Sequence, residues 1–184
     1  MQEWLPFQEI LPNGIIKLKD NSLIKILIIS PINFNLKSSL EKESILNSYK
    51  IFLKTCNFNF QILIHSNKED LSKHISSVES INKSSNLIKS SQNYINFIQN
   101  LNKERKSSCK DFYIIIQEKA ENKKQILDIK EEEILCEKLN DNYFKIKECL
   151  ARCGNTVTDS NSNSMTNEIL YSFFNTRKDL FGIN

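Results

Sequence analysis

The apolar positions of this chain follow two spacings, one typical of strands and one typical of helices. Four short apolar runs suit β-strands, and they lie at residues 14–19, 23–30, 58–65 and 112–117. The second run is apolar at nearly every position, as expected for a strand that is covered on both faces. Asp20 and Asn21 separate the first two runs and suit a tight turn, because both residue types tolerate positive φ. We therefore expect the fold to open with a hairpin.

Between the strands, apolar residues recur every three or four positions, which predicts helices. Ser38 and Glu41 have the spacing of a capping box in front of the first such segment. Its predicted apolar stripe consists of Ile45, Tyr49, Phe52, Leu53 and Cys56. Ser66 and Glu69 have the same spacing in front of a second segment, which continues to Val78. We expect a helix after each of these boxes.

The most regular stripe lies in the last third of the chain. Asp128 and Glu131 flank its start, and Gly154 lies where a C-terminal cap is expected. The stripe consists of Leu135, Leu139, Tyr143, Ile146, Leu150 and Cys153. Thr156–Thr158 then suits a short edge strand, and Met165–Phe174 suits a last helix.

Strands and helices thus follow one another in the order β-β-α-β-α-β-α-(β)-α. This order predicts an α/β (α+β) fold, with helices packed on a mixed sheet of four to five strands. The chain has 184 residues, enough for one domain and short for two, so we expect a single domain over 1–184. Residues 76–91 are rich in Ser, Asn and Lys, and a flexible loop, a frayed helix and a disordered hinge are all open interpretations there.

Composition removes several classes of function. The chain has 25 Lys and Arg against 22 Asp and Glu, and this net charge of +3 is too mild to indicate nucleic-acid binding by itself. No apolar run approaches the ~20 residues of a membrane span, and the start lacks the basic region of a signal peptide. Five Cys without framework spacing favour reduced thiols in a cytosol. We therefore expect a cytoplasmic protein.

The sequence contains none of the common catalytic motifs. Its three Gly leave no phosphate-binding loop, and the motifs of dinucleotide binding, serine hydrolases and zinc proteases are also missing. We therefore expect no enzyme activity and no catalytic, cofactor-binding or metal-binding residues. His65 and His74 are either a metal or proton-transfer pair or two structural histidines, and the second interpretation is favoured. Cys149 and Cys153, four residues apart, likewise suit a core better than a zinc site.

Two segments are candidates for binding a partner. The N-terminal segment 1–12 carries Trp4, Leu5 and Phe7 immediately before the first strand. Such a terminus either packs on its own sheet or docks a partner, and packing is favoured. Residues 66–110 hold eight basic and four acidic side chains, a local charge of +4. The candidate phosphate contacts of this region are Lys103, Arg105, Lys106 and Lys110.

Several stretches of the chain resemble one protein family. The matching stretches are Leu5–Leu18, Pro31–Glu43, Ile45–Lys54, Asp70–His74, Asp111–Ile116, Leu150–Val157 and Glu168–Asn175. They look like the small TraC-like domain proteins of conjugative elements in Gram-positive bacteria, which are similar to the N-terminal domain of conjugation and type IV secretion ATPases. The matched residues are packing and turn residues, so they indicate a fold better than an activity.

The resemblance implies a docking domain without its motor, because the large ATPases continue into a phosphate-binding motor domain. It implies an adaptor of a type IV secretion apparatus, placed peripherally at the inner face of the cell membrane. The expected partners are channel membrane proteins and the transfer ATPase, together with self-association. The alternative is an accessory nucleic-acid-binding protein of a mobile element, which would use the basic region. A small enzyme with an unfamiliar site is the third hypothesis, and nothing places a nucleophile beside a base.

Overall fold

The computed structural model describes residues 6–68, 75–78, 90–98, 100, 108–120 and 128–181. The chain divides into two compact units. One unit comprises residues 1–65 and 111–175, and the other comprises residues 66–110 and 176–184. Each unit is described by itself below.

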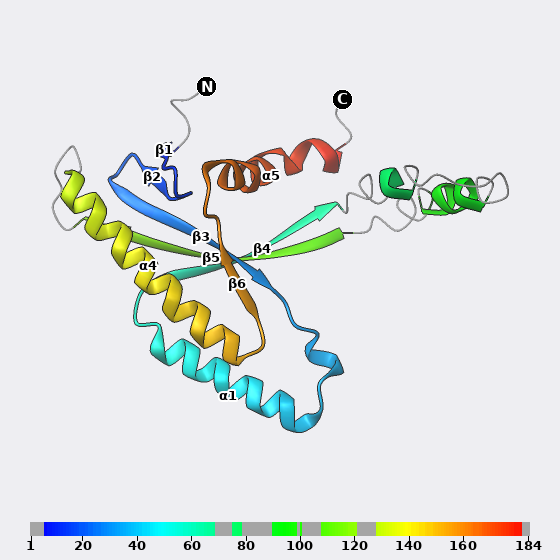
Figure 1. The fold of residues 1–184 in the computed structure, drawn as a ribbon, viewed down its shortest axis with the longest axis horizontal. Coiled ribbons are helices and arrows are strands. Elements are labelled where there is room, and N and C mark those ends of the chain that lie inside the picture. The colour runs from blue at the N-terminus through cyan, green and yellow to red at the C-terminus, as the bar shows by residue number, and fades with distance from the viewer. Residues whose placement is uncertain are drawn as a thin grey trace. The chain divides into compact units, whose positions relative to one another are not determined.

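A six-stranded antiparallel sheet organises the first unit (Figure 1). Its strands are β1 (Phe7–Ile10), β2 (Ile16–Leu18), β3 (Ser22–Ser30), β4 (Phe60–Lys68), β5 (Ser108–Lys119) and β6 (Thr156–Asp159). Five of them follow the order β1-β2-β3-β5-β4, and β6 pairs with β3. The predicted fold class is confirmed, although the sheet has one strand more than the largest number expected and its strands run antiparallel.

The central strand, β3, has partners along both of its edges. β5 pairs with one edge, from Ser22 opposite Lys119 to Ile29 opposite Phe112. The other edge is shared, because β2 pairs with the start of β3 and β6 pairs with its end, from Leu27 to Ser30. Strand partners on both edges and helices on both faces account for the nearly continuous apolar sequence of β3.

The predicted hairpin between β2 and β3 is confirmed. The backbone N–H of Asn21 donates a hydrogen bond of 3.1 Å to the carbonyl oxygen of Leu18. Asn21 has a φ of +62°, and among the described residues no other side-chain-bearing residue has a positive φ. The turn therefore lies one residue earlier than expected, centred on Lys19 and Asp20.

Two helices, α1 (Ser39–Thr55) and α4 (Ile129–Arg152), cover one face of the sheet (Figure 1). All six residues of the predicted α4 stripe are buried, which confirms this helix: Leu135, Leu139, Tyr143, Ile146, Leu150 and Cys153. The helix begins where Asp128 accepts a hydrogen bond from the Ile129 N–H, and it ends before Gly154, which has a φ of +86°. Both helices contribute to one core with the inner side chains of the strands, including Leu27 and Ile114.

A third helix, α5 (Asn163–Phe181), covers the opposite face of the sheet (Figure 1). Ile169 of this helix forms a second core with Ile26 and Tyr113 of the sheet. The ring of Phe173 lies 5.4 Å from the ring of Tyr113, edge to face. The first unit therefore has three layers, with the sheet between two layers of helix.

Two predicted element assignments differ from the structure. β1 was not predicted as a strand, because residues 1–12 were expected to be a segment before the first strand that packs on the sheet or docks a partner, whereas Phe7–Ile10 pairs with β2. β4 continues through Ser66, so the predicted capping box at Ser66 is wrong. The reason is cross-strand pairing, because neighbouring strands satisfy the backbone of polar residues that carry no strand signal of their own.

The described part of the second unit includes helical stretches at residues 75–78 and 90–98. Ile95 is buried there, whereas Phe97 is 58 % exposed. The predicted flexible segment 76–91 lies mostly outside the described residues, and its two described ends are helical.

Candidate interaction surface

The helix α1 forms the candidate interaction surface, and its start is fixed by the predicted capping box. The Ser38 hydroxyl accepts a hydrogen bond of 3.4 Å from the Glu41 N–H, and the Glu41 carboxylate accepts one of 2.9 Å from the Ser38 N–H. The hydrogen bonds that the Glu41 carboxylate accepts, first from the Ser38 N–H and then from the Ser38 hydroxyl at 2.8 Å, lower the pKa of Glu41. The capping-box prediction at this helix is confirmed.

The inner side of α1 is held by aromatic and sulfur side chains. Phe52 is fully buried, and its ring lies 5.4 Å from the ring of Phe60 on β4 and 5.5 Å from that of Tyr49. Cys56 is buried in the same core. Leu53 was expected in this stripe but is 50 % exposed, because one residue along a helix rotates the side chain by about 100° away from Phe52.

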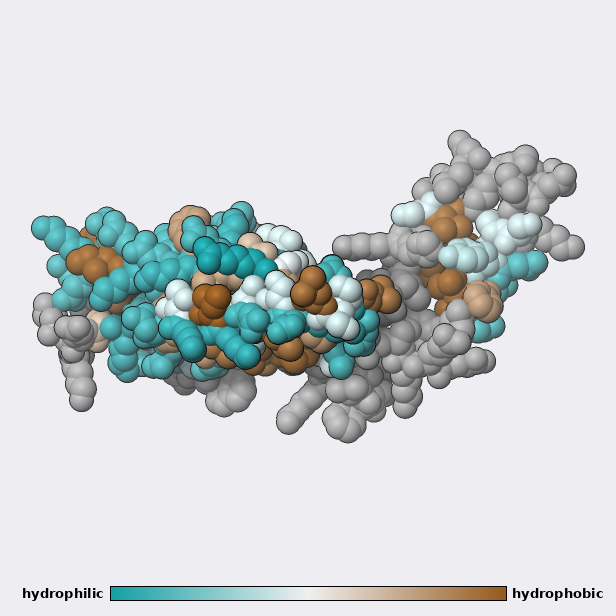
Figure 2. All heavy atoms as spheres, turned by 90° about the horizontal axis from the view of Figure 1, so that it is seen from below, coloured by the Kyte–Doolittle hydropathy of each residue, from teal (hydrophilic) through white to brown (hydrophobic). Residues whose placement is uncertain are grey.

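The outer side of α1 and the turn before it expose large apolar side chains. Their exposed fractions are Leu36 82 %, Leu40 79 %, Leu46 51 %, Ile51 49 % and Leu53 50 %. We call these five residues the α1 surface. Figure 2 views the molecule from the side on which α1 lies, and brown side chains appear there in separate islands between polar ones. These five exposed apolar side chains do not form one continuous patch, and their number on one helix and the turn before it makes α1 a candidate site for protein contact.

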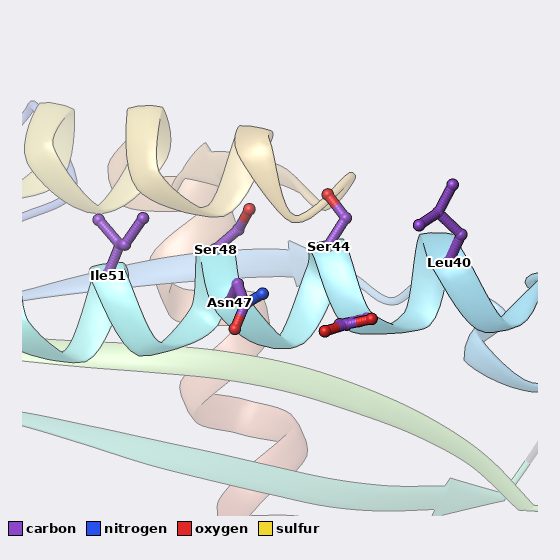
Figure 3. Close-up of a pocket in the computed structure, with 6 residues that line it drawn as sticks. Leu40, Ser44, Asn47, Ser48 and Ile51 are labelled. Carbon is purple, nitrogen blue, oxygen red and sulfur yellow. The ribbon is translucent and has the colours of Figure 1, made fainter.

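A shallow, open groove runs along part of the α1 surface. It is lined by Leu40, Glu43, Ser44, Asn47, Ser48 and Ile51. Figure 3 shows Leu40, Ser44, Ser48 and Ile51 projecting to the same side of the helix. Between Leu40 and Ile51 the groove is lined by the polar side chains of Glu43, Ser44, Asn47 and Ser48, so it has an apolar residue at each end and polar residues in the middle. A groove made by one helix does not enclose a small molecule, and it suits a protein side chain better.

A buried polar cluster lies under α4 and ties three elements together. The Lys25 ammonium of β3 lies 2.8 Å from the Asp159 carboxylate and donates a hydrogen bond of 2.7 Å to the Asn140 side-chain oxygen. Lys25 also lies 5.0 Å from the centre of the Tyr143 ring. Each of these contacts is internal to the fold, so the cluster holds β3, β6 and α4 in place.

A second ion pair joins the hairpin to the start of α4. Lys17 of β2 donates a hydrogen bond to Glu132, and this bond is the main reason why the pKa of Lys17 is raised. Glu132 lies in the first turn of α4, where a negative charge also interacts favourably with the helix dipole.

Four cysteines lie in the core or pack against it: Cys56, Cys136, Cys149 and Cys153. Burial raises the pKa of the Cys56 thiol to about 11, and burial also raises the pKa values of Cys136 and Cys153. Such thiols are poor nucleophiles. In the part of the chain that the structure describes, no three His, Cys, Asp or Glu side chains are grouped so that they could hold a metal ion.

The structure places only some of the sequence-predicted site residues. Phe7 lies in β1 and packs against the core under α5, as expected for a segment that packs on its own sheet. Lys110 is exposed on β5. His65 packs its ring edge-on against Phe173, 4.7 Å between centres. The remaining candidates lie outside the described residues: Trp4, Leu5, His74, Lys103, Arg105 and Lys106.

The α1 surface differs from the candidate binding segments that the sequence indicated. The sequence offers the N-terminal segment as a candidate for docking a partner and the basic region as a candidate for phosphate contacts. The α1 surface was missed, although Leu40 and Ile51 stand eleven residues apart, a spacing that returns to the same side of a helix after three turns. That spacing, together with the polar residues that line the groove between Leu40 and Ile51, is the feature of the sequence from which the α1 surface could have been predicted.

Comparison with known families identifies the chain as a member of the TraC-like proteins. The family model described as the archaeal TraC-like domain matches residues 8–175. The match runs from the second residue of β1 into α5 and includes the segment between β4 and β5. The expected family is therefore confirmed, and its description is archaeal where the resemblance had indicated Gram-positive bacteria.

No curated protein and no solved structure matches this chain. Within the described ranges, none of the helices is both long and apolar enough to cross a membrane.

Proposed function

We propose that this chain is a non-enzymatic docking domain of a conjugative DNA-transfer apparatus, and that the α1 surface is where it binds a protein partner. The observation that carries the proposal is the exposure of Leu36, Leu40, Leu46, Ile51 and Leu53 on one helix and the turn before it. Membership of the TraC-like family supports the apparatus. Its partners in this proposal are the transfer ATPase and the channel membrane proteins.

The construction of α1 supports a docking role. Its inner side is anchored by Phe52 and Cys56, and its first turn is capped, so the helix is a stiff support. A rigid helix presents its outer side chains without a large loss of conformational entropy on binding, which favours affinity. Apolar anchors that enter pockets of a partner supply most of the binding energy at such interfaces.

Capture from a native membrane fraction tests the proposal, with the tagged chain as bait. We expect the wild-type chain to retain the transfer ATPase or a channel protein, and Leu40→Asp to lose it. Ile129→Asp is the matched control, because Ile129 is 76 % exposed against 79 % for Leu40 but lies at the start of α4. Equal capture by Leu40→Asp and by the wild type would contradict a role for the α1 surface.

Two further assays separate the proposal from its alternatives. The purified chain should not hydrolyse ATP, and turnover that survives further purification would contradict a non-enzymatic role. DNA binding that weakens steeply with salt, in the absence of any protein partner, would favour the accessory nucleic-acid-binding protein instead.

A further inference from the structure

The two edges of the sheet are built differently. β1, at one end of the strand order, has four residues, carries Glu9 and has an irregular register between Phe7 and Glu9. Short length, charge and a bulge are the usual means of preventing a strand edge from pairing with another chain. β4, at the other end, has nine residues.

The β4 edge has none of these protections over residues 60–66. This stretch reads Phe-Gln-Ile-Leu-Ile-His-Ser, without Asp, Glu, Lys, Arg or Pro. Among the residues that the structure describes, β5 is the only strand that pairs with β4, so the outer edge of β4 offers its backbone N–H and C=O groups. An uncharged edge of this length is a template for a further strand.

The side chains of β4 point to two different surroundings. Leu63 packs into the core under α5, and His65 on the same face contacts Phe173. Phe60, on the other face, lies against Phe52 of α1. Ile62 and Ile64 follow on that face, and they are 53 % and 55 % exposed. The apolar face of β4 thus continues past the part that Phe52 covers.

We propose that β4 pairs with the β4 strand of a second copy of this chain, antiparallel and with Leu63 on the two-fold axis. In this register, Ile62 of one copy lies opposite Ile64 of the other, so the symmetric pair buries four isoleucines and extends the sheet across both copies. Over residues 60–66 the strand is its own complement, because this stretch has no charge that selects an oppositely charged partner, and its one charged residue, Lys68, lies outside the proposed pairing.

Sedimentation velocity of the full chain tests the pairing at loading concentrations from about 1 to about 100 μM. We expect a concentration-dependent dimer for the wild type and a monomer for Ile62→Lys, because a lysine on an edge strand opposes pairing. Ile134→Lys is the matched control and should remain dimeric, since Ile134 is 52 % exposed but lies on α4. A monomeric wild type overturns the proposal, and so does a dimer that Ile62→Lys leaves intact.

Cross-linking tests the register independently of any effect on folding. In a Cys109→Ser background, Ile62→Cys and Ile64→Cys chains are purified separately and then mixed under mild oxidation. We expect the mixture to form a disulfide-linked dimer at least about fivefold faster than either variant alone, because only the mixed pair sets the two thiols directly opposite. Equal rates in all three samples would overturn the register.

Self-pairing through β4 and partner binding through the α1 surface can be tested separately. Ile62→Lys should still capture the partner that Leu40→Asp loses, because β4 and the outer side of α1 carry different residues. If Ile62→Lys instead abolished capture while the wild type sedimented as a monomer, β4 would bind an extended segment of the partner, and self-pairing would be overturned.

Discussion

A Cβ atom on Gly14 would lie 1.9 Å from the carbonyl oxygen of Ser160, so the turn before β2 and the loop after β6 meet without room for any side chain. The Thr166 hydroxyl donates a hydrogen bond of 2.9 Å to the Gly14 carbonyl oxygen at the same place. The N–H of Ser160 donates to the Ile26 carbonyl oxygen at 3.2 Å. These contacts bring the first hairpin and the start of α5 together across about 150 residues of sequence.

Gly14→Ala should therefore destabilise the fold by about 3 kcal/mol or more, because backbone atoms must move and Gly14 has a φ of +78°. Urea unfolding followed by circular dichroism measures the loss. Gly154→Ala is the matched control, since Gly154 has a φ of +86° but its Cβ would meet only the Ile32 side chain at 3.6 Å. The control should lose about 1 kcal/mol, and equal losses would show that close approach does not matter at Gly14.

Removing one partner of the Lys25–Asp159 pair should lower the free energy of unfolding strongly, whereas replacing both partners by apolar residues should lower it much less. Asp159→Ala leaves the Lys25 ammonium, 6 % exposed, without its carboxylate, and we expect a loss of about 3 kcal/mol in the free energy of unfolding. Lys25→Met combined with Asp159→Leu should recover more than half of that loss, because no buried charge remains.

Denaturant titration of Lys25→Met, of Asp159→Leu and of the double variant that combines them measures the coupling between these two residues. If the double variant were as unstable as the sum of the single variants, the two side chains would act independently and the ion pair would not hold β3 and β6 together.

The Asp20 carboxylate should make stability depend on acid pH. Hydrogen bonds from Lys119, at 2.8 Å, and from Ser22 hold the pKa of Asp20 at about 2, below its ordinary value of 3.8. A depressed pKa stabilises the fold above pH 3.8. This contribution is lost as the pH falls towards about 2.

The stability difference between the wild type and Asp20→Asn should accordingly be present at neutral pH and vanish towards pH 2. We expect a difference below about 1 kcal/mol, because the Asp20–Lys119 pair is solvent-exposed. An NMR titration of the Asp20 carboxyl carbon reports its pKa directly, and a midpoint near 4 would contradict the role of Lys119 and Ser22.

The buried thiols should react slowly in the native state. In a Cys109→Ser chain, we expect the remaining four cysteines to react with a thiol reagent only as the protein opens, so the rate should rise with urea in parallel with unfolding. Fast reaction of one thiol equivalent at neutral pH would show an exposed, low-pKa cysteine and would contradict the assignment of these residues to the core.

Long, regular elements of this chain could be predicted, and short or long-range ones could not. The α4 stripe is visible because six apolar residues repeat over a 24-residue helix between Asp128 and Gly154. β1 could not be predicted from the sequence, because it has only four residues. Its two apolar residues, Phe7 and Ile10, do not alternate with polar ones in the way that is typical of a strand. The position of β6 beside β3 depends on pairings such as Ile28 with Thr158, which no local pattern contains.

The surface of α1 illustrates a second limit. Sequence periodicity shows which residues share one side of a helix, but not how much of the helix circumference the rest of the fold covers. Phe52 is buried and Leu53 is half-exposed because the sheet and α4 meet only one side of α1. Periodicity alone therefore did not bring Leu40 and Ile51 forward as candidate docking residues.

The most direct test of the account is the affinity of the purified full chain for the purified transfer ATPase, measured by isothermal titration calorimetry. The account predicts saturable binding that Leu40→Asp weakens by about tenfold or more and that Ile129→Asp leaves unchanged. Binding of equal strength by both variants, or no binding to the ATPase or to any channel protein of the same element, would contradict the claim that α1 is the docking surface of this domain.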